Sequence, residues 1–410
     1  METTVDYLII GGGIAGVTAA ETIRETDKTS TIAIIASEPH MLYSRVLLPS
    51  YIKQRIKREQ VFMRKISDYD AANISFYAGE EAVEVRPTAH DVVLRSGAVM
   101  RYGKLLIATG GHVRQVPFQG VEGISGVFRL QTIDDADFLY QALPSIKEAV
   151  VLGGGFIALE FLEILRLRGI STTLVCKSER FAEGLMSEAG SGILETNFAD
   201  HEIKVLLKES VAEVESENGK IVAVRTFDGK EIKCDALCVG IGIEKNISFL
   251  KDSGIATGED SILADKFLTT NDLDIFAAGD VVEFDDVIFG VKQRVGNWNN
   301  AFLQGKAIGR TMRGDKTEFR NLSGYSISNL SFHLTFVGRI SRELKSVVRY
   351  LPGKSQYAEF FFANGSMAGA SLINLPKLQA QVQKWILGKY DFSGREAELA
   401  DVKVSLDSST

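Results

Sequence analysis

The pattern of apolar positions divides the start of the chain into a strand, a turn, a helix and a second strand. Residues 5–10 form an apolar run that is too short to cross a membrane and lacks helical periodicity, which is typical of a buried strand in a parallel sheet. A glycine-rich turn follows at residues 11–16, and a helix is expected to begin near Val17. Residues 32–36 form the next apolar strand. This order predicts a strand–helix–strand unit with parallel strands.

The glycines of the turn each meet a different steric need. Gly11 permits the tight turn, Gly13 lets a diphosphate approach the backbone, and Gly16 lets the helix pack closely on the strand. The helix start directs unsatisfied N–H groups and a positive dipole end at the turn. Glu38 follows the last glycine at about the 20-residue distance of an acid that binds a ribose hydroxyl. Together these features predict a dinucleotide-binding unit.

The same pattern recurs in the middle of the chain. Residues 149–152 form a short apolar strand that ends at Gly153 and Gly155. Ala158 stands at the last position of the turn, where alanine is permitted, and residues 172–176 form the following strand. One chain therefore carries two predicted dinucleotide-binding units.

The second unit differs from the first at the end of its second strand. Cys176 stands where an acid is expected, and Lys177 and Arg180 follow it. The loss of the carboxylate and the gain of nearby cations suit the 2′-phosphate of NADPH. Alternatively, both cations are solvated loop charges and the ribose is held in another way.

Further candidate residues lie near the ends of other predicted strands. Residues 104–111 form a strand that ends in a glycine turn, and residues 271–280 form one that ends in Gly-Asp. Arg45 follows Glu38 in an apolar segment, where its guanidinium either contacts a pyrophosphate or remains a solvated charge. Trp298, near the start of a periodic helix, either flanks a ring system or packs in the core.

The remaining segments predict smaller sheets. Residues 73–102 are interpreted as a β-meander, and residues 203–243 as alternating strands and turns. From about residue 325, antiparallel strands are followed by an amphipathic helix over residues 376–387. His333 lies in an apolar, strand-like run and is expected in the core.

Composition narrows the possible functions. The chain has 410 residues, of which 45% are hydrophobic and 24% charged, and a net charge of −7, which together predict a globular protein of two to four domains. Because no lysine or arginine cluster stands out, nucleic acid is not an expected partner. No apolar stretch approaches the ~20 residues of a membrane span and no signal peptide is visible, so we expect no membrane partner and a cytoplasmic protein.

The number of cysteines also favours a cytoplasmic protein. The three cysteines are too few for a secreted disulfide framework. Cys234 and Cys238 are expected to share one face of a strand as small buried side chains, and no metal site is expected.

The chain resembles the FAD-dependent pyridine nucleotide-disulfide oxidoreductase superfamily over about residues 1–310. The resemblance is carried by the first glycine turn with Glu38, the second glycine turn, and the two segments Ala108-Thr109-Gly110 and Ala278-Gly279-Asp280. Within the superfamily, residues 43–52 and 298–305 resemble rubredoxin reductases and the flavin domain of the nitrite reductase large subunit.

This resemblance implies an α/β fold with two Rossmann-like dinucleotide-binding domains, the FAD domain being interrupted by the NAD(P) domain, and a small α+β C-terminal domain. We expect the FAD domain at residues 1–117 and 245–322, the NAD(P) domain at residues 118–244, and the C-terminal interface domain at residues 323–410.

The resemblance also implies site residues. Arg45 is expected to contact FAD, Asp280 its ribityl or phosphate region and Trp298 the flavin surroundings, while Ser50 stands where related proteins often have a lysine, with Lys53 one turn away. The expected FAD-binding residues are Gly11, Gly13, Ile14, Ala15, Gly16, Glu38, Arg45, Ser50, Ala82, Ala108, Thr109, Gly110, Gly279, Asp280 and Trp298. The expected NAD(P)-binding residues are Gly153, Gly155, Phe156, Ile157, Ala158, Glu160 on the nicotinamide side, Lys177 and Gly240.

The expected activity is an electron transfer without a redox-active disulfide, since no cysteine lies between Met1 and Val175. Electrons would pass from NAD(P)H through FAD to a rubredoxin, a ferredoxin or a metal-centre subunit, in a monomer or homodimer. Hydride transfer requires no acid–base side chain, so no catalytic residue is named. The alternatives are an NAD(P)H oxidase or diaphorase, and an accessory FAD-binding electron-transfer subunit of a larger complex.

Overall fold

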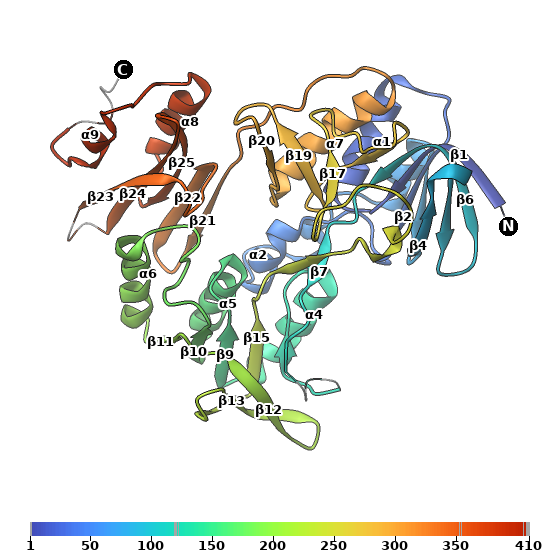
Figure 1. Ribbon diagram of the computed structural model, residues 1–410. Helices are drawn as coiled ribbons and strands as arrows, with labels where there is room; N and C mark the ends of the chain where they lie inside the picture. Colours follow the sequence, from blue (N-terminus) through green and yellow to red (C-terminus); the bar gives the residue numbers. More distant parts are fainter. Residues whose placement is uncertain are drawn as a thin grey trace. The chain divides into compact units, whose positions relative to one another are not determined.

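The computed structural model describes residues 2–118, 121, 123–351, 353, 355–404 and 406. The chain divides into two compact units. Figure 1 labels their helices and strands. The first unit contains the segments Met1–Tyr51, Ile56–His112 and Ile243–Asn321. The second unit contains the segments Ile52–Arg55, Val113–Gly242 and Leu322–Thr410. The chain therefore passes between the units five times.

A seven-stranded sheet forms the centre of the first unit. Its order is β3-β2-β1-β6-β5-β4, and β18 also pairs with β6. The strands are β1 (Glu2–Ile10), β2 (Ile32–Ala36), β3 (Ile74–Ala78), β4 (Ala82–Arg86), β5 (Asp91–Leu94), β6 (Val99–Ile107) and β18 (Ile275–Ala277).

The parallel and antiparallel parts of this sheet meet on β6. β1, β2, β3, β6 and β18 are parallel, whereas β4 and β5 are antiparallel additions. The first half of β6 pairs with β5 and the second half with β18. The prediction of a separate β-meander at residues 73–102 is therefore wrong for β3, which is a parallel strand beside β2 along its whole length.

Two helices of the first unit pack closely against each other, α1 (Ile14–Thr26) and α7 (Trp298–Met312). A Cβ atom on Gly305 would lie 2.5 Å from the carbonyl oxygen of Ala15, and one on Gly309 would lie 2.8 Å from that of Ala19, so glycine permits the close approach. α1 begins three residues before the predicted start, because the N–H of Val17 makes the first helical hydrogen bond, to Gly13 at 3.0 Å.

The other elements of the first unit are short. They include α2 (Leu48–Ile52) and β7 (Gly111–Val113), whose last residues belong to the second unit, and α3 (Ile66–Ala71), β16 (Ile243–Lys245), β17 (Ile262–Ala264), β19 (Val282–Asp286) and β20 (Val291–Gln293). β7 pairs with β16, and β17, β19 and β20 form a small sheet.

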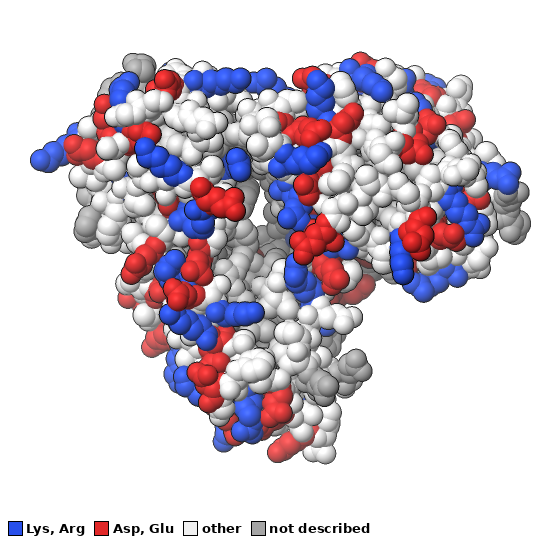
Figure 2. Space-filling model, viewed as in Figure 1, with Lys and Arg blue, Asp and Glu red and all other residues white. Residues whose placement is uncertain are grey.

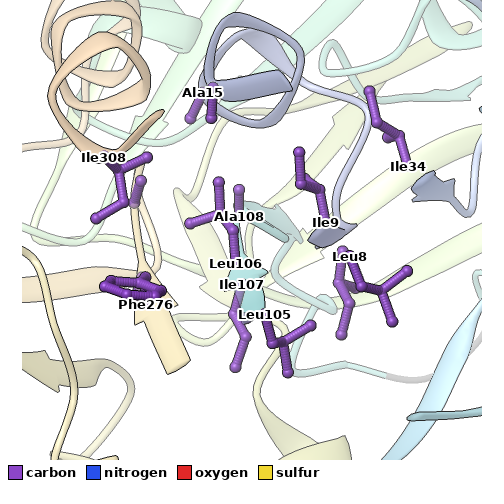
Figure 3. Packing of buried hydrophobic residues seen from close by; sticks show 14 of the residues in the cluster. Leu8, Ile9, Ala15, Ile34, Leu105, Leu106, Ile107, Ala108, Phe276 and Ile308 are labelled. Carbon is purple, nitrogen blue, oxygen red and sulfur yellow. The ribbon is translucent and has the colours of Figure 1, made fainter. Parts of the chain in front are cut away.

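The core of the first unit lies between the parallel strands and these two helices (Figure 3). Leu8 and Ile9 of β1, Leu106 of β6, Phe276 of β18 and Ile308 of α7 are all at most 1% exposed. Each such side chain contributes about 1.5–3 kcal/mol through burial. Because strands covered on both faces need apolar residues throughout, the continuous apolar runs in the sequence are explained.

The second unit contains a five-stranded parallel sheet of order β11-β10-β9-β15-β8. Its strands are β8 (Val127–Phe128), β9 (Glu148–Leu152), β10 (Ser171–Cys176), β11 (Lys204–Leu207) and β15 (Ala236–Val239). The associated helices are α4 (Ile133–Ala142), α5 (Phe156–Leu167) and α6 (Glu188–Asp200).

A small antiparallel sheet precedes β15 and consists of β12 (Val211–Glu217), β13 (Lys220–Thr226) and β14 (Glu231–Lys233). Cys234 lies between β14 and β15, so the expectation that Cys234 and Cys238 share a strand is wrong. Both are buried free thiols, as expected. Between the two strands, the carboxylate of Asp235 accepts the N–H groups of Lys147 and Glu148 at 2.8 and 3.1 Å.

The C-terminal part of the second unit is an antiparallel sheet of order β21-β22-β25-β24-β23, with two helices. Its elements are β21 (Gly324–Asn329), β22 (Phe332–Gly338), β23 (Lys345–Leu351), β24 (Gln356–Ala363), β25 (Ser366–Ile373), α8 (Leu378–Leu387) and α9 (Glu396–Ala400). His333 is half-buried and contacts the Ser328 hydroxyl at 2.7 Å, so its predicted core position is wrong. It points away from the core because its neighbours Phe332 and Leu334 occupy the buried face of β22.

A buried carboxylate joins this sheet to α6. Glu359 of β24 is fully buried and accepts hydrogen bonds from the Ser187 N–H at 2.8 Å and the Tyr357 hydroxyl at 2.5 Å. Its other oxygen contacts Ser346 at 2.7 Å and Arg342 at 3.0 Å. Since Ser187 is the N-cap of α6, the carboxylate holds the start of that helix.

Charged side chains of both signs are interleaved on the face shown in Figure 2. Among the described residues, no helix combines the length and the apolar character that a membrane span requires.

Candidate functional site

The first glycine turn lies at the carboxyl ends of β1, β2 and β6. Gly11 has a φ of +123°, and a Cβ there would lie 2.2 Å from the carbonyl oxygen of Ala108. The N–H of Gly11 donates to Ile35 at 2.8 Å, and that of Ala108 donates to Ile10 at 2.8 Å. A Cβ on Gly16 would lie 2.1 Å from the oxygen of Gly11. The predicted roles of Gly11 and Gly16 in turn geometry and packing therefore have a steric basis.

Open space lies above this turn. Gly13 caps α1 without a side-chain hydrogen bond, and a Cβ built there meets no atom within 4 Å. The first turn of α1, which contains Ile14 and Ala15, carries no acidic residue. Gly110 has a φ of +61° and equally open surroundings, while the hydroxyl of Thr109 donates to Asn246 at 3.1 Å. Free N–H groups beside open space fit a diphosphate.

The acid at the end of β2 is held by two neighbours. The carboxylate of Glu38 accepts hydrogen bonds from the Tyr43 hydroxyl and the Arg45 guanidinium. Burial lowers the pKa of Arg45, but Tyr43, Glu38 and Asp280 more than offset this and raise it overall. Arg45 is therefore not the solvated loop charge of the alternative reading.

Two further predicted residues lie outside this arrangement of polar contacts. Buried Ala82 begins β4, three residues after Gly79, whose N–H donates to the Glu38 carbonyl at 3.3 Å. Ser50 is half-buried in α2, and among the described residues no hydrogen bond joins it to the turn.

A second group of predicted residues lies between β18 and α7. Gly279 has a φ of +85°, and its N–H donates to the side-chain oxygen of Gln304 at 2.7 Å. Burial raises the pKa of Asp280, while Lys245 and Arg45 lower it in part. Trp298 begins α7 and packs, half-buried, against the core of the first unit.

Gln304 is a candidate that the sequence analysis missed. It is fully buried, and its Nε2 has no hydrogen-bond partner among the described residues. Its signal was its place in residues 298–305, the segment that carries the resemblance to rubredoxin reductases, although no role was assigned to it there.

The second glycine turn repeats the geometry of the first. Gly153 has a φ of +129°, and a Cβ there would lie 2.2 Å from the carbonyl oxygen of Gly240. Gly240 in turn has no room for a Cβ, which would lie 2.9 Å from the nitrogen of Ala158. Gly155 caps α5 beside open space. The structure thus brings these four predicted residues together in a second cradle.

The first turn of α5 presents two different side chains. The ring of Phe156 packs edge-on against Tyr325 and Phe336 of the C-terminal sheet, with centroids 5.2 and 5.4 Å away. Ile157 is 37% exposed. Lys177, at the end of β10, is exposed as well.

A buried charge cluster lies further along α5. The Lys53 side chain is 3% exposed, and its ammonium lies 2.7 Å from Glu160 and also pairs with Glu163. Asn329 accepts a further hydrogen bond from it at 3.3 Å, and Arg55 lies 3.3 Å from Glu163. Glu160 is therefore neutralised by a lysine far away in sequence, which local patterns do not reveal.

Metal and thiol chemistry find no support in the described residues. They contain no group of three or more metal-ligating side chains. Burial raises the pKa of Cys234 to about 12 and that of Cys238 still further, so these thiols remain protonated.

Comparisons with known proteins agree with this geometry. The family described as pyridine nucleotide-disulphide oxidoreductase matches residues 5–305. Rhodocoxin reductase of Rhodococcus erythropolis is 26% identical over 403 residues, covering 98% of this chain and 94% of that protein. The assimilatory nitrate reductase electron transfer subunit of Bacillus subtilis is 22% identical over 97% of this chain and 51% of its own length.

A solved structure shows the same fold. The ferredoxin reductase for the CYP199A2 system from Rhodopseudomonas palustris superposes with a TM-score of 0.88 at 25% identity, covering 98% of this chain and 99% of that one. The predicted fold class, with two Rossmann-like domains and a C-terminal sheet domain, is confirmed. With most of its length matched and two nucleotide cradles present, the chain belongs to the pyridine nucleotide-disulphide oxidoreductase family.

Proposed function

We propose that the protein is an FAD-dependent NAD(P)H oxidoreductase that passes electrons from NAD(P)H through FAD to a small iron protein of the ferredoxin or rubredoxin kind, or to a metal-centre subunit. The observation that carries this proposal is the pair of glycine cradles with matching geometry, one in each unit. Each has an uncapped helix start beside open space, as a dinucleotide diphosphate requires.

The first cradle is assigned to FAD and the second to NAD(P)H. Residues 1–117 and 245–322 would form the FAD domain, residues 118–244 the NAD(P) domain, and residues 323–410 the interface domain. In the first cradle, the start of α1 would hold the diphosphate and Glu38 a ribose hydroxyl, with Arg45 beside them. When bound, the flavin accepts a hydride from the nicotinamide and gives up electrons singly.

The chain's own residues contribute binding and orientation to this chemistry. Among the described residues the three cysteines are buried and unpaired, which argues against a thiol relay. Free thiols also suit a reducing compartment, and we propose a cytoplasmic location on that basis. Glu160 remains the candidate for the nicotinamide side, and Phe156 remains a candidate for NAD(P) binding.

The names of relatives support the choice of acceptor. The names of rhodocoxin reductase and of the ferredoxin reductase from Rhodopseudomonas palustris each contain the name of a carrier protein. The Bacillus subtilis relative is named as an electron transfer subunit. We therefore propose a small carrier as the acceptor and keep a partner metal subunit as the alternative within the same class.

The test is anaerobic mixing of the purified yellow protein with NADH and, separately, NADPH while the absorbance of the oxidised flavin is followed. Fast bleaching by at least one nucleotide is expected. No bleaching by either would overturn the proposal and favour an accessory flavoprotein subunit. Rapid turnover in air without any carrier would favour an oxidase instead.

Matched variants assign the two cradles. A Cβ fits at both Gly13 and Gly155, and aspartate is a favourable helix cap, so Gly13→Asp and Gly155→Asp should fold. The added carboxylate repels a diphosphate at either helix start. Gly13→Asp should be purified without flavin, whereas Gly155→Asp should retain flavin that NAD(P)H reduces at least tenfold more slowly. The reverse pattern would contradict the assignment.

A further inference from the structure

The loop after β10 differs from an ordinary NADH-binding loop in its chemistry. β10 ends at Cys176, whose Sγ would lie 2.7 Å from a Cβ built on Gly154. The thiol thus lies directly against the glycine turn of the second cradle. It is 1% exposed, and burial, together with Glu195 and Glu183, raises its pKa. A neutral group therefore occupies the place of the carboxylate that binds both ribose hydroxyls of NADH.

The backbone of this loop is fixed at both ends. The carbonyl oxygens of Cys176 and Ser178 accept the N–H groups of Glu209 and Lys208 at 3.1 and 3.0 Å. Further along, the N–H of Ala182 donates to the carbonyl of Gly154 at 3.3 Å, so the loop folds back onto the glycine turn. Side chains on residues 177–181 are consequently presented from a rigid frame beside the cradle.

The acidic side chains around this loop are already engaged. Glu179 pairs with Lys208 at 2.7 Å, and Glu183 pairs with Arg180 at 3.2 Å. Glu195 accepts the N–H of Phe181 at 3.0 Å. None of these three carboxylates is left to bind a ribose hydroxyl as an otherwise unpaired acceptor.

The cations of the loop are not fully engaged. The exposed Lys177 ammonium has no hydrogen bond or ion pair with any residue that the structure describes. Arg180, by contrast, is engaged, because its guanidinium lies 3.2 Å from Glu183 and 3.8 Å from Glu179. One free ammonium, that of Lys177, thus lies on the loop that ends the ribose-binding strand, where a 2′-phosphate would need a donor.

We propose that the second cradle takes NADPH in preference to NADH, with Lys177 binding the 2′-phosphate and the Cys176 thiol leaving room for it. This inference rests on the proposed function, since it concerns the electron donor of that reaction. Lys177 is the specificity-determining residue, because its charge is uncompensated. Cys176 contributes to the preference because its thiol is neutral, whereas a carboxylate at this position repels the 2′-phosphate.

The experiment measures the rate constant of anaerobic flavin reduction against nucleotide concentration for both donors. The variants are Lys177→Ala and Cys176→Glu, with Lys220→Ala as the matched control, because Lys220 is an exposed lysine of the same unit on β13. A direct readout that needs no flavin chemistry is calorimetric titration of the holoprotein with 2′,5′-ADP and with 5′-AMP.

The wild-type protein should use NADPH at least tenfold more efficiently than NADH and bind 2′,5′-ADP more tightly than 5′-AMP. Lys177→Ala should lower the efficiency of flavin reduction by NADPH about tenfold, which is the lower end of the effect of losing a hydrogen bond to a charged group, because the site is exposed. The efficiency with NADH should stay within about twofold of the wild-type value. The NADPH reaction should weaken with added salt more than the NADH reaction. Cys176→Glu should reverse the preference.

Failure of this inference is distinguishable from failure of the proposed function. Preference for NADH, or a Lys177→Ala variant that behaves like Lys220→Ala with both donors, would overturn the NADPH assignment while leaving the reductase intact. If Cys176→Glu folds poorly, the calorimetric titration of Lys177→Ala with 2′,5′-ADP and 5′-AMP still tests the NADPH assignment. Reduction by neither donor would overturn the proposed function itself.

Discussion

Replacement of Lys53 by methionine should destabilise the second unit strongly. The Lys53 side chain is 3% exposed, and its ammonium contacts Glu160 and Glu163, which are 15% and 11% exposed. Methionine fills a similar volume but leaves two nearly buried carboxylates facing each other without their shared cation. The perturbation therefore removes charge compensation with little change in packing.

The expected magnitude follows from this burial. Breaking a buried ion pair by removing one partner costs about 3–5 kcal/mol. The second unit holds about 220 residues, a size at which 1 kcal/mol lowers the melting temperature by roughly 2–4 °C. Lys53→Met should therefore lower the melting temperature of that unit by about 6 °C or more.

Arg55 supplies the matched control in the same cluster. Its guanidinium pairs with Glu163 at 3.3 Å, but the side chain is 53% exposed, so Arg55→Met should cost only about 0.2–1 kcal/mol. Differential scanning calorimetry of both variants makes the comparison. A triple variant with Lys53→Met, Glu160→Gln and Glu163→Gln should recover much of the loss, because it removes the uncompensated charges. Equal shifts for Lys53→Met and Arg55→Met would refute the reasoning.

Two further predictions concern a junction and a surface turn. Glu359→Ala should cost roughly 3 kcal/mol or more in urea unfolding, because it removes the buried acceptor that the Tyr357 hydroxyl, the Ser346 hydroxyl and the Arg342 guanidinium share. Tyr357→Phe should cost about 1 kcal/mol, and similar costs for the two variants would contradict the central role of the carboxylate. Hydrogen bonds from the Ser30 side chain and backbone lower the pKa of Asp27 to about 2, so the ionised carboxylate stabilises the fold above its ordinary pKa of 3.8, and this contribution is lost as the pH falls towards 2. Asp27→Asn should therefore be destabilising at about pH 7 and progressively less so below about pH 4, and a cost independent of pH would argue against this linkage.

Local sequence patterns predicted the strand, glycine turn and helix of both cradles, because these three parts are adjacent in the chain. The carbonyl that lies against each turn comes from a distant segment, Ala108 at Gly11 and Gly240 at Gly153, and the local pattern did not pair these segments with the turns. The structure brought together most of the residues assigned to each cradle. Their contacts with cofactors remain predictions.

Long-range contacts could not be predicted in this way. The pairing of Lys53 with Glu160 and Glu163 joins segments more than 100 residues apart, and the clamp between Glu359 and Ser187 joins segments 172 residues apart. Nothing in the local pattern of either partner distinguishes it from a surface charge. Which residues form such pairs depends on how the fold brings distant segments together, and the spacing of apolar residues along the chain does not reveal it.

The errors in predicted strands have similar causes. β3 pairs parallel to β2, and this pairing depends on the whole sheet and not on residues 73–102. Cys234 lies between β14 and β15, beside Asp235, whose carboxylate binds two N–H groups more than 80 residues away in the chain. In both cases the boundaries or partners of a strand depend on tertiary contacts that a local pattern does not contain.

The five passages of the chain between the two units also dictate when each part can fold during synthesis. β1 leaves the ribosome with the first residues, but its sheet lacks β18 and its helix α1 lacks α7 until residue 312 has been made. At a synthesis rate of about 5–20 residues per second, the apolar face of that sheet stays without β18 and α7 for roughly 15–60 seconds. In the meantime the uninterrupted segment Val113–Gly242 is complete. The nascent chain therefore finishes an interior insert first, and its opening strands are the part most in need of protection by chaperones.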